Sequence, residues 1–93
     1  MVTDIQTRFS DFDMMYHVNN IAQQYYFDLG NVAYFRRVLG IHSGRDDLGL
    51  IKARVEVNFY EPIEVDDKIC VTTKVERIGT KSITMWQEII CKK

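Results

Sequence analysis

Apolar and polar residues alternate along four stretches of the chain, and each stretch predicts a β-strand. The four stretches span residues 2–10, 50–60, 68–77 and 82–91. In the first stretch, Ile5, Thr7 and Phe9 occupy the side that is expected to face the core. The last stretch is apolar on both faces, as is typical of an interior strand or of a strand that takes a partner.

A helical period predicts one long helix between the first two strands. Either asparagine of the pair at 19–20 is suited to cap its start, because the side-chain oxygen can accept a free N–H of the first turn. Gly40 is suited to its end, where a left-handed residue is favoured. The face expected to pack on the sheet carries Ile21, Tyr25, Leu29, Val32 and Leu39. The order of elements therefore predicts an α+β fold, in which a long helix packs on an antiparallel sheet.

Length, charge and cysteine content narrow the class of protein. The chain has 93 residues, which makes one domain near the small end of what folds alone. Its formal net charge of −1 argues against a nucleic-acid or anionic-membrane surface, and the polar N-terminus predicts no signal peptide. Cys70 and Cys91 are too widely spaced for a disulfide framework or a metal pair. We therefore expect a cytoplasmic protein without a metal site, a membrane span or a nucleic-acid partner.

Three short runs near the start of the chain carry a family resemblance. They are Arg-Phe-Ser-Asp-Phe-Asp at 8–13, His-Val-Asn-Asn at 17–20 and Tyr-Phe-Asp at 26–28. Together they resemble the start of hot-dog thioesterases of the 4-hydroxybenzoyl-CoA thioesterase-like family. The segments at 58–67 and 78–82 are similar to that family's second strand and hairpin, so the resemblance covers nearly the whole chain.

The chain departs from the family pattern at two positions and in its length. Tyr16 stands where the family commonly has glycine, and Gln23 stands where it usually has tyrosine. Family members usually continue through a fifth strand, and their strand order is first, third, fourth, fifth, second. The resemblance therefore implies a single hot-dog domain over residues 1–93 that is short at its C-terminus. We expect strand 82–91 to pair with strand 50–60 or with a second copy, or else the chain to be a marginally stable piece of a longer protein.

The resemblance implies an acyl-CoA thioesterase, which hydrolyses an acyl-CoA thioester to a free acid and CoA. This reaction needs a carboxylate that acts as nucleophile or activates water, and donors for the developing oxyanion. Asp13 matches the family's catalytic acid, and His17 is a second catalytic candidate. The helix start supplies free N–H groups and the positive end of the helix dipole. The residues expected to bind substrate, through the backbone N–H groups of this turn, are Tyr16, Val18, Asn19 and Asn20.

The resemblance also implies partners. No cofactor is expected, since coenzyme A is part of the substrate. The site is expected to lie between the subunits of a homodimer or homotetramer, and the regular alternation of residues 50–60 makes the edge of that strand a template for pairing. The sequence leaves open which acyl chain is preferred, and whether CoA or an acyl-carrier protein carries it.

Structural roles stay open for the same residues. Asp13 could cap a turn, His17 could be a structural hydrogen-bonding residue, and the asparagines at 19–20 could act only as helix caps. Asp11 is expected to orient the turn or to pair with Arg8. For the whole domain, the alternatives to an enzyme are a module that binds an acyl thioester without turnover and a purely structural dimerising fragment.

Overall fold

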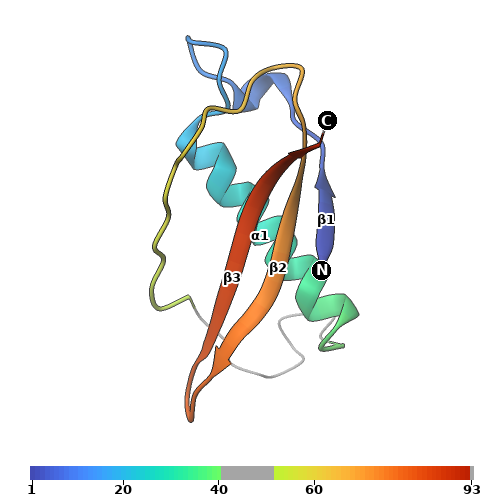
Figure 1. Ribbon diagram of the computed structural model, residues 1–93, viewed down its shortest axis with the longest axis vertical. Helices are drawn as coiled ribbons and strands as arrows, with labels where there is room; N and C mark the ends of the chain where they lie inside the picture. The colour runs from blue at the N-terminus through green and yellow to red at the C-terminus, as the bar shows by residue number, and fades with distance from the viewer. Residues whose placement is uncertain (41–51, 93) are drawn as a thin grey trace.

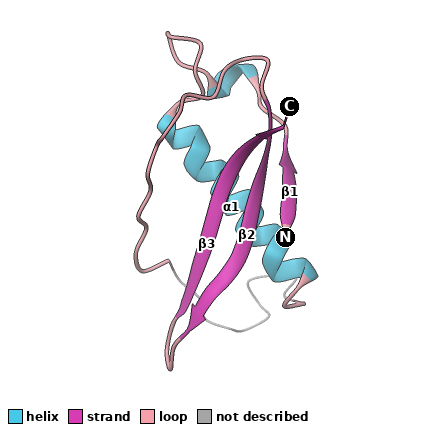
Figure 2. Ribbon diagram, in the orientation of Figure 1, coloured by secondary structure: helices cyan, strands magenta, loops and turns pink. Residues whose placement is uncertain are grey.

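The structure, a computed structural model, describes residues 1–40 and 52–92 (Figure 1). In chain order its elements are β1 (Val2–Ile5), a short 3-10 helix η1 (Phe9–Asp11), α1 (Asn20–Arg37), β2 (Lys68–Ile78) and β3 (Ile83–Lys92). The three strands form one antiparallel sheet, and α1 crosses one face of it (Figure 2). This is the α+β arrangement that the element order predicts.

The β2–β3 hairpin is the longest ladder of the sheet. It runs from Lys68 opposite Lys92 to Ile78 opposite Ile83, with one irregularity beside Val75. Both strands begin and end within one residue of the predicted ranges, because a long alternating pattern fixes which side chains face the core. The sheet order β1-β2-β3 also confirms the first three places of the predicted strand order.

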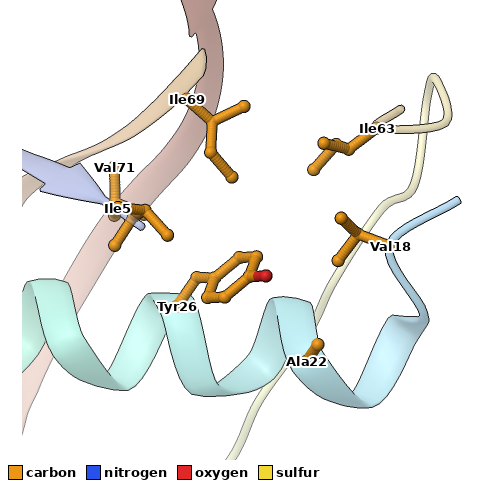
Figure 3. Packing of buried hydrophobic residues seen from close by; sticks show 7 residues of the cluster. All are labelled: Ile5, Val18, Ala22, Tyr26, Ile63, Ile69 and Val71. Carbon is orange, nitrogen blue, oxygen red and sulfur yellow. The ribbon is translucent and has the colours of Figure 1, made fainter. Parts of the chain in front are cut away.

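The core lies between α1 and β2. Ala22 and Tyr26 of the helix pack with Ile69 and Val71 of the strand (Figure 3). The whole cluster of buried apolar side chains is Ile5, Val18, Ala22, Tyr26, Ile63, Ile69 and Val71. Helix and sheet pack tightly at Gly30, where an added Cβ would lie 2.8 Å from the Val71 Cγ1 atom. Gly30 thus leaves no room for a side chain between the helix and the sheet at this point.

The face of α1 that packs on the sheet is not the predicted one. The residues expected to be buried are at least 41% exposed, and they are Ile21, Tyr25, Leu29, Val32 and Leu39. The buried residues of the helix are Ala22, Gln23, Tyr26 and Gly30. The helix is apolar on two sides, and the side that packs on the sheet includes Ala22 and Gly30, whose small size lets the two backbones approach. The spacing of large apolar residues therefore predicts the wrong face.

The first strand is also shorter than predicted. β1 ends at Ile5, and Phe9, which was expected to face the core, is 96% exposed. The chain leaves the sheet because two residues form a reciprocal turn. Arg8 N–H donates to Asp11 Oδ2 at 3.0 Å, and Asp11 N–H donates to Arg8 O at 2.9 Å. These local hydrogen bonds override the alternating pattern.

The segment with the most regular alternation does not form a strand in the described residues. Residues 52–60 run past the sheet without a ladder partner, and the outer edge of β3 is unpaired within the described part of the chain (Figure 1). An ion pair ties the segment to α1, with Lys52 Nζ 2.5 Å from Asp28 Oδ1. Alternation defines the two faces of a strand, but a ladder also needs a neighbouring strand. The predicted pairing with strand 82–91 is therefore not formed by residues 52–60, while residues 50 and 51 lie outside the described range.

Candidate active site

A hairpin-like loop connects η1 to α1 and carries the candidate catalytic residues. Its base is closed by a hydrogen bond of 2.9 Å from Asn19 N–H to Asp11 O. The next two residues inward form an isolated antiparallel bridge. Asp13 N–H then donates to His17 O at 2.9 Å. These three cross-links place Asp13 and His17 opposite each other near the tip of the loop, just before the helix.

The carboxylate of Asp13 caps the turn at the tip. Its Oδ1 accepts hydrogen bonds from the N–H groups of Met15, at 2.9 Å, and His17, at 3.2 Å. Tyr16 completes the turn with a left-handed backbone, φ 60°, a conformation that glycine would adopt without strain. The structural role considered for Asp13 is therefore present. Asp13 is exposed, and its Oδ2 makes no hydrogen bond within the described part of the chain, so one oxygen is left for chemistry.

Most backbone N–H groups ahead of the helix already donate within the protein. Those of residues 16–19 donate to protein oxygen atoms at 2.8 to 3.2 Å. Asn19 is the N-cap, and its Oδ1 accepts the Ala22 N–H at 2.7 Å. The first two N–H groups of α1, those of Asn20 and Ile21, have no partner within a helix by its geometry. Of the backbone N–H groups predicted to be oxyanion donors, only that of Asn20 is therefore left to bind an oxyanion, and the N–H of Ile21 lies beside it.

A shallow pocket of about 240 Å³ opens beside the loop. Residues 15–17 form one wall and residues 64–67 form the other, and an antiparallel bridge between His17 and Glu64 joins the two walls. Tyr16 and His17 are thus brought to one pocket. The other candidate residues lie outside its lining, and they are Asp13, Val18, Asn19 and Asn20. Val18 packs in the core instead.

Neither a metal site nor a membrane span occurs in the residues that the structure describes. No group of three or more histidine, cysteine, aspartate or glutamate side chains is placed there to hold a metal ion. No helix of that part of the chain combines the length and hydropathy needed to cross a bilayer.

Asp11 is the buried acid of the loop. It is 5% exposed, and its Oδ2 accepts the Tyr26 hydroxyl at 2.5 Å. Burial acts to raise the pKa of Asp11, but the hydrogen bonds from Tyr26 and Arg8 and the charge of Arg8 outweigh it and lower that pKa below 3.8. Burial and the bond to the Asp11 carboxylate together raise the pKa of Tyr26 above 10.0. The expected pairing with Arg8 is confirmed, with Arg8 Nη2 3.6 Å from Asp11 Oδ1.

The sequence matches one family of proteins. Residues 7–93 match the family described as the Thioesterase-like superfamily. The uncharacterized protein YsmA of Bacillus subtilis is 20% identical over 81 residues, which make up 87% of this chain and 54% of YsmA. The chain therefore spans about half the length of this curated relative.

Two solved structures are similar along almost the whole of this chain. A thioesterase from Thermus thermophilus, solved with coenzyme A and zinc, is 28% identical with a TM-score of 0.83, over 97% of this chain and 66% of that one. A proposed acyl-CoA thioesterase from Xanthomonas campestris is 29% identical with a TM-score of 0.85, over 99% of this chain and 77% of that one. The chain has the hot-dog fold of these proteins, with one helix packed on an antiparallel sheet, and it belongs to the Thioesterase-like superfamily.

Proposed function

We propose that the protein hydrolyses an acyl-CoA thioester to a free acid and CoA. Membership of the family supports thioester hydrolysis, and the similar proteins from Thermus and Xanthomonas support coenzyme A as the carrier. The observation that carries the proposal is the position of the Asp13 carboxylate. It lies in the loop that leads directly into the N-terminus of α1, and the residues that the structure describes engage only one of its two oxygens.

Asp13 supplies the base or the nucleophile in this proposal. As a base, its Oδ2 takes a proton from water, and the water oxygen attacks the thioester carbonyl carbon to give a tetrahedral oxyanion. The carbon–sulfur bond then breaks, and CoA leaves as a thiolate that takes up the proton. As a nucleophile, Oδ2 itself attacks the carbonyl carbon, the CoA thiolate leaves, and water hydrolyses the resulting mixed anhydride. Both routes give the same acid and thiol.

The backbone N–H groups of Asn20 and Ile21 are the proposed oxyanion donors. They lie at the positive end of the α1 dipole and need no side-chain movement to meet a developing charge. In a complex with a substrate analogue, we expect the carbonyl oxygen about 3 Å from these nitrogen atoms. A carbonyl oxygen that points away from the helix N-terminus would contradict this assignment.

The pocket beside the loop is not lined by Asp13 or Asn20, and it is proposed to receive a part of the substrate that adjoins the thioester rather than the thioester itself. Tyr16 and His17 form one wall, whereas the opposite wall carries the carboxylates of Glu64, Asp66 and Asp67. Three acids would repel the phosphates of CoA, so we expect these phosphates to lie outside this pocket. His17 is the second candidate for acid–base chemistry. A His17→Gln variant with an unchanged pH–rate profile would remove it from that role.

Replacing Asp13 with asparagine tests the proposal. The amide oxygen can still accept the two N–H groups of the turn, but asparagine cannot act as base or nucleophile. We expect kcat for thiol release from a panel of acyl-CoAs to fall about 10²- to 10⁴-fold, with fold and CoA affinity unchanged. Asp28→Asn removes a carboxylate that pairs with Lys52 away from the loop, and as the matched control it should keep the original kcat. Retention of more than about half the activity in Asp13→Asn would contradict the assignment.

A homodimer or homotetramer is part of the same proposal. Two features support it, namely the large apolar side chains exposed along α1 and the unpaired outer edge of β3 in the described residues. Exposed apolar surface and open strand edges are both stabilised by a second copy. Sedimentation of an active monomer at micromolar concentration would overturn this part of the proposal.

A module that binds an acyl thioester without hydrolysing it is the second candidate function. It is favoured by the turn-capping role of Asp13, which already engages one oxygen of the carboxylate. Saturable binding of acyl-CoA, with thiol release no faster than that of Asp13→Asn, would support this alternative and exclude the enzyme.

A further inference from the structure

The hydrogen bond between Asp11 and Tyr26 joins two side chains that are both nearly inaccessible to solvent. Asp11 is 5% exposed and Tyr26 is 3% exposed, and the hydroxyl lies 2.5 Å from Asp11 Oδ2. The ring of Tyr26 lies in the middle of the core, and its hydroxyl points toward the end where Val18 lies (Figure 3). A buried carboxylate is costly unless it is hydrogen-bonded. The pair is therefore a directional contact that joins a ring of the apolar cluster to a buried acid.

Asp11 is held from three sides. Besides the Tyr26 hydroxyl, its Oδ2 accepts the Arg8 N–H at 3.0 Å, and its Oδ1 faces the Arg8 guanidinium at 3.6 Å. Its main-chain carbonyl accepts the Asn19 N–H at 2.9 Å. Asp11 thus connects the end of η1, the start of α1 and the second turn of α1 through one residue.

The same residue controls the loop that carries Asp13. The closing bond at Asp11, the bridge that follows it and the bond from Asp13 N–H to His17 O are successive rungs of one short ladder. A shift of the first rung therefore moves the third. Tyr26 stands six residues after Asn20 on the same rigid helix. Its hydrogen bond to Asp11 therefore fixes the position of the loop relative to α1, the helix that presents the oxyanion donors.

We propose that the Asp11–Tyr26 hydrogen bond positions the Asp13 carboxylate relative to the N-terminal N–H groups of α1. This inference rests on the proposed function, because it assigns the pair a role in that reaction. Neither Asp11 nor Tyr26 touches the substrate in this scheme, so both are positioning residues. Catalytic groups need placement to within about 0.5 Å, and a misplacement of about 1 Å costs about 10²-fold in rate.

Tyr26→Phe is the test, since it removes the hydroxyl and keeps the ring in the core. We expect kcat for thiol release to fall at least about tenfold, while KM for acyl-CoA stays within about threefold. Tyr25→Phe is the matched control, because this neighbouring tyrosine is 61% exposed, and it should keep the original kcat. Asp11→Asn supplies a second variant of the pair, and the double variant should lose no more activity than the more impaired single variant.

The backbone amide resonances of the Asp13 turn, measured by NMR, report on its geometry without depending on activity. The amide resonances of Met15 and His17, which donate to Asp13 Oδ1, should shift in Tyr26→Phe and stay in place in Tyr25→Phe. Unchanged resonances would overturn the inference, even if kcat fell, because the loss would then not pass through the turn. A loss that appears only as a higher KM would also overturn it.

The two proposals fail in different ways. If Asp13→Asn keeps its activity, the catalytic assignment fails whatever Tyr26→Phe does. If Asp13→Asn is inactive and Tyr26→Phe keeps the original kcat, the positioning role alone is wrong.

Discussion

Replacing Gly30 with alanine should destabilise the protein, although alanine is the better helix former. In an isolated helix the change would be stabilising by about 1 kcal/mol. In this structure the added Cβ would lie 2.8 Å from three side-chain atoms at once, which are Gln87 Nε2, Thr73 Oγ1 and Val71 Cγ1. Contacts as short as these are strongly repulsive, so the interface between helix and sheet must move.

Little of the surrounding structure is free to move. Val71 and Thr73 are almost fully buried on the central strand, and Gln87 Nε2 donates to Phe27 O at 2.8 Å and to Thr73 Oγ1 at 3.0 Å. Overpacking costs about 1–3 kcal/mol, and losing the two hydrogen bonds costs about 1 kcal/mol each. Set against the gain in helix propensity, the net loss of stability is about 2–4 kcal/mol. For a domain of this size, the melting temperature should fall by about 8–30 °C.

Urea unfolding followed by circular dichroism measures this loss. We expect the midpoint to fall while the slope of free energy against denaturant stays the same. Arg36→Ala changes an exposed residue of the same helix and should stay within about 0.5 kcal/mol of the original protein. A midpoint for Gly30→Ala that is equal or higher would refute the close crossing, and with it the packing of the Gly30 side of α1 on the sheet.

Three further predictions concern the helix cap, the buried acid and whether thiol release needs a metal ion. Asn19→Ala should lower the free energy of unfolding in urea by about 1 kcal/mol, because Asn19 Oδ1 accepts the Ala22 N–H, whereas Asn20→Ala should lower it much less. Equal losses for the two variants would show that Asn19 is not the helix cap. The Asp11 carboxyl has its pKa lowered by folding, so it contributes stability that is present above about pH 3.8 and is lost as the pH falls below that value. The stability of Asp11→Asn should therefore fall less steeply with decreasing pH than that of the original protein, as followed by circular dichroism. Acid-unfolding curves of the two proteins that superimpose would contradict this. Dialysis against EDTA should leave thiol release unchanged, since the proposed chemistry uses a carboxylate, and a loss that zinc restores would show otherwise.

The elements that follow from the sequence are those set by local rules. The β2–β3 hairpin needs only its own alternating pattern, and α1 needs only a helical period with an asparagine at its start. The sequence could not choose between Asn19 and Asn20 as the cap, because both side chains are suitable. Only the backbone of Asn19, which is extended, leaves its oxygen near the Ala22 N–H.

The features that the sequence could not predict depend on contacts between distant residues. The large apolar side chains of α1 indicated the wrong face, because the helix packs tightly on the sheet at Gly30, where there is no room even for a Cβ beside Val71. The alternation of residues 52–60 predicts a strand, but it carries no information on whether a neighbouring strand is present, and none of the described strands pairs with these residues. Similarly, the burial of Asp11 depends on Tyr26, fifteen residues further along the chain. The one local signal of the Asp11–Tyr26 pair was that Asp11 stands two residues before Asp13, the candidate base.

The open edge of β3 divides the backbone N–H groups of this strand into two classes. In an antiparallel strand, successive N–H groups point alternately to the two sides. Those on one side are held by β2, whereas those on the other meet no strand in the described part of the chain. Hydrogen exchange along the 10 residues of β3 should therefore alternate between slow and fast. A strand that docks on the edge would slow only the fast class, so β3 carries its own residue-by-residue reporter of whether that edge is occupied.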